Sequence, residues 1–195
     1  MTPVRVAVLA SGGGTNLQAL LDALTGSLAR VALVLSDRPQ AGALERARRA
    51  GVAEAALRDP ADAAELLAAL TDADLVVLAG YLKLVPPAVV ARFRWRMINI
   101  HPALLPAFGG PGMYGRRVHE AVLASGAEES GATVHYVDEL YDRGPIIAQA
   151  RVPVRPDDTP ETLGARVLDA EHRLLPMVVL ELARRGVPNE PVRIA

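Results

Sequence analysis

The first half of this sequence alternates short apolar, β-branched runs with segments of helical periodicity, and this alternation constrains the fold more than any other feature. The run from Leu75 to Ala79 is apolar without interruption, as expected of a strand buried on both faces. Such strands belong to β-α-β units, which build a parallel sheet with helices on both sides. Further strands are expected at Val4 to Ala10, Val31 to Ser36 and near Val52 to Leu57, with helices from about Thr15, through Leu44 and Ala47, and from about Asp62 to Leu70.

The second half predicts a different pairing of strands. A strand at Met97 to Ile100 ends at His101-Pro102, and the glycine- and proline-rich stretch after it has a length that usually indicates a functional loop. The segment 132–137 alternates apolar and polar residues, and 146–154 is expected to pair with it across a turn. The fold class is therefore α/β: a Rossmann-like, mostly parallel sheet flanked by helices, with antiparallel strands added in the C-terminal half.

Composition and charge exclude several classes of function. The formal charge of -1 argues against a protein held to nucleic acid by electrostatics and favours a small-molecule partner. Because there is no cysteine, a disulfide framework, a thiolate zinc site and a cysteine nucleophile are excluded. The first residues run directly into a strand pattern, and no apolar stretch has membrane-spanning length. We expect a single domain in the cytoplasm, without a membrane partner.

A loop from Ser11 to Asn16, between the first strand and the first helix, contains three consecutive glycines. Backbone N–H groups at such a helix start bind anions, so a phosphate is the expected ligand, and a tight turn without a ligand is the alternative. Asp37 follows the second strand where an acidic residue could hold the ribose of a dinucleotide, but Leu17 replaces the third glycine of that pattern. Thr15 and Asn16 could instead hydrogen-bond a terminal phosphate and cap the helix, which favours a phosphomonoester.

Asn99 and His101 are two residues apart on a strand, so their side chains point to the same face at the carboxyl end of the sheet. An amide that binds an oxyanion and an imidazole that moves a proton are groups that acyl transfer needs. Asp138, Glu139 and Asp142 crowd a nearby turn, and at least one carboxylate could orient His101 and raise its pKa. The alternatives are loop-anchoring hydrogen bonds for the first pair and a solvated turn for the carboxylates.

Other polar residues are interpreted in structural terms. His135 is expected to be a hydrogen-bonded core histidine, and His119 a structural or surface residue. No spacing of histidines and carboxylates supplies three convergent ligands, so no metal is expected. Glu171 stands on the apolar face of the last predicted helix, where a buried carboxylate needs a partner. That partner could be Arg166, Arg173, or the hydroxyls or amine of a bound substrate.

Three segments carry a family resemblance: Ser11-Gly-Gly-Gly-Thr-Asn-Leu-Gln18, Met97-Ile-Asn-Ile-His-Pro-Ala-Leu-Leu-Pro106, and Gly131-Ala-Thr-Val-His135 with Asp142-Arg-Gly-Pro145. Together they closely resemble the glycinamide ribonucleotide transformylase family, over nearly the whole chain. The second and third segments are shared by folate enzymes that handle formyl groups, whereas the glycine loop and the chain length indicate the subfamily. The resemblance implies transfer of a formyl group from 10-formyltetrahydrofolate to the amine of glycinamide ribonucleotide in purine synthesis, without a metal or a covalent acyl-enzyme.

The resemblance also assigns residues to roles. It implies catalysis by Asn99, His101 and Asp142, phosphate binding by Gly14, Thr15 and Asn16, ribose or nearby polar contacts by Glu171, and folate binding by Leu82, Lys83, Leu84 and Val85 with Asn99. In the expected mechanism, Asn99 and protonated His101 stabilise the oxyanion while Asp142 sustains the imidazolium. Residues 1–96 would form the phosphate-binding half of the domain and 97–195 the catalytic and folate-binding half. Whether the protein forms a homodimer is left open.

Competing functions share parts of this pattern. Methionyl-tRNA formyltransferase would need a basic RNA-binding domain and formyltetrahydrofolate deformylase an extra regulatory domain, and we expect neither in this chain. A nicotinamide-dependent dehydrogenase built on Asp37, or a non-catalytic nucleotide-binding module, would leave His101 and Asp142 unexplained. Protection by a folate analogue, protection by a dinucleotide, and phosphate-ligand binding without turnover would separate the three classes.

Overall fold

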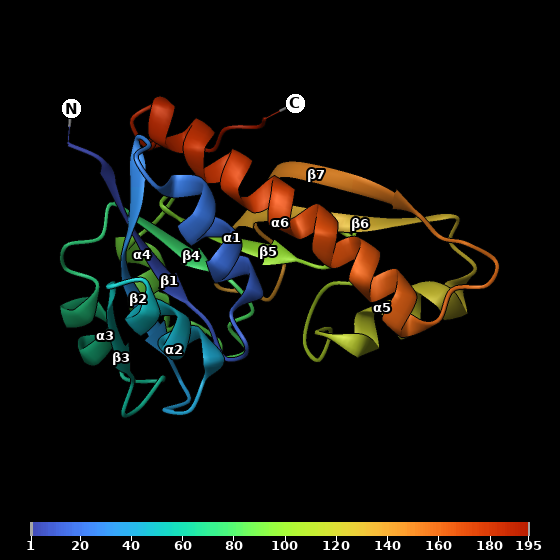
Figure 1. Cartoon of the computed structure of the whole chain (residues 1–195), viewed down its shortest axis with the longest axis horizontal. Coiled ribbons are helices and arrows are strands. Elements are labelled where there is room, and N and C mark those ends of the chain that lie inside the picture. Colours follow the sequence, from blue (N-terminus) through green and yellow to red (C-terminus); the bar gives the residue numbers. More distant parts are fainter. Residues whose placement is uncertain (1, 195) are drawn as a thin grey trace.

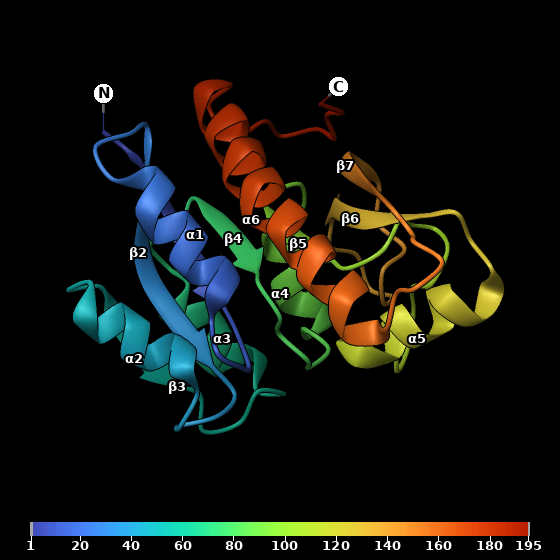
Figure 2. The same ribbon diagram turned by 45° about the vertical axis from the view of Figure 1, so that its right-hand side comes forward.

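The structure is a computed structural model that describes residues 2–194, and in this part of the chain one sheet is covered by helices on both faces (Figures 1 and 2). The strands are β1 (Val4–Leu9), β2 (Ala29–Ser36), β3 (Ala53–Ala56), β4 (Leu75–Leu78), β5 (Met97–His101), β6 (Glu129–Tyr136) and β7 (Ile146–Pro153). They lie in the order β3-β2-β1-β4-β5-β6-β7, in which β6 pairs antiparallel with both β5 and β7 and the other pairs are parallel. The predicted fold class is confirmed.

Two helical layers cover the sheet. The helices are α1 (Thr15–Leu24), α2 (Gly42–Arg49), α3 (Ala63–Ala69), α4 (Pro87–Arg92), α5 (Arg116–Ser125) and α6 (Pro160–Arg184). Along β1, Val6 and Val8 pack with α1, α2 and α6, whereas Ala7 and Leu9 pack with α3 and α4. This alternation is the period-two geometry of a strand buried on both faces. α4 was not predicted from the sequence, because six residues are too few to show helical periodicity.

The long helix α6 connects the two halves of the chain. It begins with Pro160 as its first residue, and the Thr159 side chain caps it by accepting from the Thr162 backbone N–H. Its buried face packs against α1, α5, β6 and β7, and Figure 2 shows it crossing the molecule beside α1. The carboxylate of Glu171 is carried by this face. Among residues 2–194, no helix has the length and apolar character needed to cross a membrane.

The junction of β5 with β6 sets the positions of the polar residues that follow. In the ladder Asn99 lies opposite His135 and His101 opposite Thr133. The register shift between Val134 and His135 lies on the other side of β6, in its pairing with β7. The Thr133 hydroxyl donates to the carbonyl of Ala103 at 2.6 Å and accepts from the backbone N–H of Leu105 at 3.1 Å. The chain that leaves β5 is therefore fixed to β6 from its first residues onward.

Candidate active site

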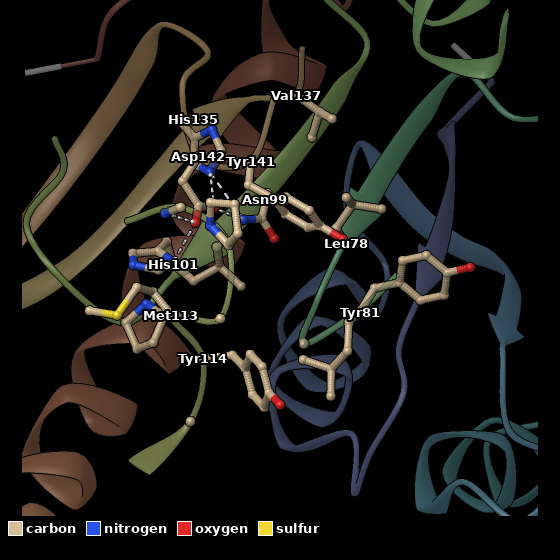
Figure 3. Close-up of a pocket in the computed structure, with 18 of the residues that line it drawn as sticks. Leu78, Tyr81, Asn99, His101, Met113, Tyr114, His135, Val137, Tyr141 and Asp142 are labelled. Atoms are coloured by element: carbon tan, nitrogen blue, oxygen red, sulfur yellow. Dashed lines mark hydrogen bonds and ion pairs between the residues drawn. The ribbon is translucent and has the colours of Figure 1, made fainter. Parts of the chain in front are cut away.

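A cavity of about 580 Å³ opens at the carboxyl ends of β4 and β5, where open α/β sheets place their ligands. Its walls come from these strand ends, from loops at residues 80–85, 110–116 and 137–142, and from one side of α6. Figure 3 shows the side chains of Asn99, His101, His135 and Asp142 gathered in one part of the wall. The volume suits small organic molecules.

The three predicted catalytic residues meet in this cluster. Asp142 Oδ2 lies 3.5 Å from His101 Nδ1, and Asp142 Oδ1 lies 3.6 Å from His135 Nε2. Asn99 Nδ2 lies 3.0 Å from His135 Nε2 and 3.4 Å from Asp142 Oδ1. Asp142 is thus the acidic residue of its turn that pairs with His101, whereas Asp138 accepts a hydrogen bond from the backbone of the turn itself.

The surroundings of His101 set its tautomer. Its Nε2 lies 2.8 Å from the carbonyl oxygen of Phe108, and because a carbonyl can only accept, Nε2 carries a proton. Burial lowers the pKa of His101, and the nearby charge of Asp142 and the Phe108 carbonyl offset only part of this effect. The carboxylate of Asp142 thus raises the pKa of His101 as predicted, but the effect of burial is larger and the net shift is downward. The resting form is a neutral imidazole with its proton on Nε2.

Asp142 is held in an uncommon backbone conformation, with φ at 57° in the left-handed region. Burial alone would raise the pKa of Asp142, but the contacts with His135, His101 and the backbone N–H of Gly110 lower it overall. That N–H donates to Asp142 Oδ2 at 2.9 Å. The carboxylate is therefore ionised, and the Gly110 N–H holds it beside both histidines.

His135 is a buried, hydrogen-bonded residue, as expected from the sequence, and it also belongs to this cluster. It lines the cavity and contacts both Asn99 and Asp142. Its Nδ1 lies 2.8 Å from the carbonyl oxygen of Tyr136, so Nδ1 carries the proton and Nε2 accepts from the Asn99 amide nitrogen. The amide oxygen of Asn99 is left on the side away from His135. The contact with Asn99 depends on the pairing of β5 with β6, which could not be read from the sequence alone.

The glycine loop is joined to α6 by one short hydrogen bond. Asn16 Nδ2 donates to Glu171 Oε2 at 2.6 Å, and both side chains line the cavity. Burial raises the pKa of Glu171 to about 7, although the Asn16 hydrogen bond acts in the opposite direction. Neither Arg166 nor Arg173, the two arginines considered as partners of Glu171, contacts it; its hydrogen-bond partner is Asn16. Arg166 instead forms an ion pair with Asp158 at 2.8 Å.

The start of α1 differs from the expected one. Its N-cap is Gly14, at φ 73°, and no side chain caps the helix, so the prediction that Thr15 or Asn16 does so is wrong. A Cβ on Gly14 would lie 2.7 Å from the Cα of Ala43, so α1 and α2 can approach this closely only with glycine there. Asn16 reaches the catalytic cavity, whereas Gly14 and Thr15 are its immediate neighbours at the exposed end of the helix.

The predicted folate residues line the same cavity. Val85 is buried, while Leu82, Lys83 and Leu84 are exposed. Leu140 and Tyr141, on the turn that carries Asp142, also line the cavity, whereas the lining residues Tyr81, Met113, Tyr114 and Leu168 were not singled out from the sequence. The glycine- and proline-rich loop that supplies Met113 and Tyr114 was recognised as functional only by its length.

His119, which was expected to be structural or at the surface, is a buried residue that lines the cavity. A Cβ on Gly164 of α6 would lie 3.0 Å from its ring, so α5 and α6 approach closely there. Burial, and then the nearby charge of His101, lower the pKa of His119. No group of three or more His, Cys, Asp or Glu residues in the range 2–194 is placed to hold a metal ion.

Comparison with known proteins decides the family. Residues 4–179 match the model described as formyl transferase. Phosphoribosylglycinamide formyltransferase of Mycobacterium tuberculosis is 46% identical over 194 residues, covering 95% of this chain and 87% of the relative. This chain belongs to the phosphoribosylglycinamide formyltransferase branch of the formyl transferase family.

Solved structures of the formyl transferase family agree with this assignment. The crystal structure of glycinamide ribonucleotide transformylase 1 from Symbiobacterium toebii has a TM-score of 0.88 and 42% identity, covering 98% of this chain and 92% of that one. The chain is also 46% identical over 186 residues to the chloroplastic phosphoribosylglycinamide formyltransferase of Arabidopsis thaliana, covering 90% of its own length. It spans less than two thirds of the plant relatives it matches, 64% of that protein and 62% of the one from Vigna unguiculata.

Proposed function

We propose that this formyl transferase moves the formyl group of 10-formyltetrahydrofolate to the amine of glycinamide ribonucleotide, giving formylglycinamide ribonucleotide and tetrahydrofolate for purine synthesis. The observation that carries the proposal is one cavity whose lining includes the Asn99, His101 and Asp142 cluster, the Asn16–Glu171 pair and the loop 82–85. A cavity with a polar and an apolar part suits direct transfer between two bound molecules, because holding both in position replaces a collision in solution.

The polar part suits the ribonucleotide. The Gly14, Thr15 and Asn16 segment begins α1, and the exposed N–H groups of a helix start favour a phosphate. The Glu171 carboxylate lies 2.6 Å from Asn16 and could accept hydrogen bonds from ribose hydroxyls once ionised. Substrate hydroxyls would then supply donors to a buried carboxylate that has a single amide partner.

The apolar part suits the folate. Leu82, Leu84 and Val85 offer hydrophobic surface, and their backbone groups can hydrogen-bond the polar edge of a flat heterocycle. Tyr141 and Leu140, on the turn that carries Asp142, are exposed on the other side of the opening. A ring bound between these two loops would meet Asn99 and His101 at its formyl-bearing end.

The reaction needs three groups to act together. The lone pair of the neutral amine attacks the formyl carbon, and the oxyanion that forms accepts hydrogen bonds from His101 Nε2–H and the Asn99 amide. For His101 this requires exchange of the Phe108 carbonyl for the oxyanion, and for Asn99 it requires one N–H to leave His135 or Asp142. The bond from the formyl carbon to the folate nitrogen then breaks, and the proton lost by the amine reaches that nitrogen. The ionised Asp142 favours any positive charge that develops on His101.

The test is absorbance on mixing the protein with glycinamide ribonucleotide and 10-formyl-dideazafolate, followed as release of the deformylated product. We expect a signal that depends on the amine and that falls on the order of a hundredfold or more in His101→Ala or Asn99→Ala. His172→Ala, a histidine of α6 outside the cavity lining, is the matched control and should keep wild-type turnover. An amine-independent signal would indicate a hydrolase, and no signal would refute the proposal.

Three broader expectations accompany this function. We propose that residues 1–96 supply the phosphate-binding half and 97–195 the catalytic and folate-binding half, with the cavity between them. A cytoplasmic location suits purine synthesis in a bacterial relative such as that of Escherichia coli, although the names of the plant relatives say chloroplastic. We also predict that the activity does not require a metal ion, which chelator treatment would test. A homodimer stays a possibility, which light scattering would test.

A further inference from the structure

A second cavity, of about 520 Å³, lies against the glycine loop and shares no lining residue with the catalytic cavity. It opens at the carboxyl ends of β1 and β2, between the exposed glycines Gly12 and Gly13 and the turn at residues 37–42. The three residues expected to hold the substrate phosphate, Gly14 to Asn16, lie outside it. The function proposed above therefore leaves this cavity unused.

The cavity contains a buried carboxylate that lacks donors. The side chain of Asp37 is 1% exposed, and no described residue forms a hydrogen bond with its Oδ1. Its Oδ2 has one charged neighbour, Arg38 Nε at 3.8 Å, on a side chain that is 58% exposed. Buried charged oxygens normally accept hydrogen bonds, because water is no longer there to solvate them. Asp37 is therefore placed to accept hydrogen bonds from a ligand.

The two cavities are connected through Tyr81 and Ser11. In Figure 3 the Tyr81 hydroxyl points away from the His101 and Asp142 cluster, and within residues 2–194 it too is buried without a hydrogen-bond partner. Burial, and then the negative charge of Asp37, raise the pKa of Tyr81 above its usual value. Ser11 Oγ accepts from the backbone N–H of Leu82 at 2.9 Å, so a wall of the second cavity holds the loop that lines the first.

The chemistry of these groups selects one class of ligand. A free anion would be repelled by Asp37, and a simple cation would meet the guanidinium of Arg38. Vicinal hydroxyls donate hydrogen bonds and suit a carboxylate acceptor, as an acidic residue after the second strand does for ribose in other α/β sheets. A phosphate beyond them could accept from exposed backbone N–H groups of Gly12 and Gly13 and from Arg38.

We propose that this second cavity binds a phosphorylated ribose, whose cis-hydroxyls donate to Asp37 and whose phosphate lies against Gly12, Gly13 and Arg38. The site is distinct from the substrate site, so both can be filled at once. Because Ser11 and Tyr81 connect the cavity to the loop at residues 80–85, its occupation should also change the affinity for the folate, and the folate should change its affinity by the same factor.

The test measures binding of ribose 5-phosphate by calorimetry to the wild-type protein, without folate and with glycinamide ribonucleotide at saturation. We expect saturable binding of one equivalent, and at least about tenfold weaker binding for 2-deoxyribose 5-phosphate and for Asp37→Asn, which each remove part of a charged hydrogen bond. Inorganic phosphate should bind more weakly than either sugar. Asp157→Asn, an exposed aspartate before α6, is the matched control and should bind as the wild type does.

Each other outcome would overturn the proposal. Equal affinity for the two sugars, or an affinity of Asp37→Asn for ribose 5-phosphate equal to that of the wild type, would mean that Asp37 does not accept hydrogen bonds from the hydroxyls. Lack of saturable binding at millimolar probe would mean that a buried water between Asp37 and Tyr81 satisfies both groups. Should glycinamide ribonucleotide itself fail to bind, the proposed function is refuted, whereas the comparison of the two sugars still decides this site.

Discussion

Replacement of Glu171 by glutamine should stabilise the protein above neutral pH. Burial raises the pKa of Glu171 to about 7 in the folded protein, against an ordinary value of 4.5 that applies after unfolding. Between these two pH values the folded state binds one proton that the unfolded state has released. The free energy of unfolding therefore falls as the pH rises from about 4.5 to about 7, and it stays lower above that range.

The magnitude follows from the two pKa values. Ionising the buried carboxylate at pH 8 costs about 3 kcal/mol of folding free energy, because each pKa unit corresponds to about 1.4 kcal/mol. Glutamine has nearly the same shape, and its oxygen can keep the hydrogen bond from Asn16 while its amide nitrogen can donate to Asn16 Oδ1, which lacks a partner among the described residues. Glu171→Gln should therefore gain about 3 kcal/mol at pH 8 and less than about 1 kcal/mol at pH 5.

The assay is urea unfolding of the wild type and Glu171→Gln at several values between pH 5 and pH 8, followed by circular dichroism. Glu190→Gln, at an exposed position near the C-terminus, controls for loss of one negative charge and should follow the wild type throughout. Parallel curves for wild type and Glu171→Gln would show that the carboxylate is not buried in solution as described here. The same variant should lose affinity for the ribonucleotide, since a neutral amide accepts hydrogen bonds less strongly than a carboxylate.

Three further predictions concern the cluster and the core. Asp142→Asn should reduce turnover by on the order of a hundredfold and lower the pKa of His101 further, since the Asp142 charge raises it; steady-state kinetics and an NMR titration of the histidines would show both, and an unchanged titration would contradict the pairing. Gly144→Ala should destabilise the fold by about 3 kcal/mol or more, because its Cβ would overlap the carbonyl of Tyr136; a urea midpoint equal to that of the wild type would refute this. Leu175→Ala, at a fully buried position of α6, should cost about 2 to 5 kcal/mol in the same assay without a change in KM.

The parts of the site that follow from regular geometry were predictable from sequence. The face shared by Asn99 and His101 depends only on the period of two along β5, and the position of the glycine loop depends on the order of strand and helix. Glu171 was recognisable because a carboxylate on the apolar face of a helix is unusual. These patterns are local in the sequence, so they can be recognised without knowing which helices and strands become neighbours in the fold.

The features that could not be predicted from sequence depend on contacts between distant segments of the chain. Asn16 lies 155 residues from Glu171, so nothing local indicated that they would pair. The assignment of His135 to the core missed its cross-strand partner, and the expected effect of a carboxylate on the pKa of His101 left out burial, which depends on the loop that follows β5. Electrostatic predictions are the most sensitive to such errors, since a charge nearby and a loss of solvent act in opposite directions.

The pairing of β5 with β6 has a consequence for how this protein can change over evolutionary time. Asn99 and His135 face each other through ladder hydrogen bonds, and the intervening chain from 102 to 128 spans a loop and α5 outside that ladder. Insertions or deletions in this intervening chain leave the catalytic pairing intact, whereas one residue gained or lost inside β6 would turn His135 away from Asn99. Variation in substrate range can thus accumulate in the loop around Met113 and Tyr114 while the chemistry stays fixed by the sheet.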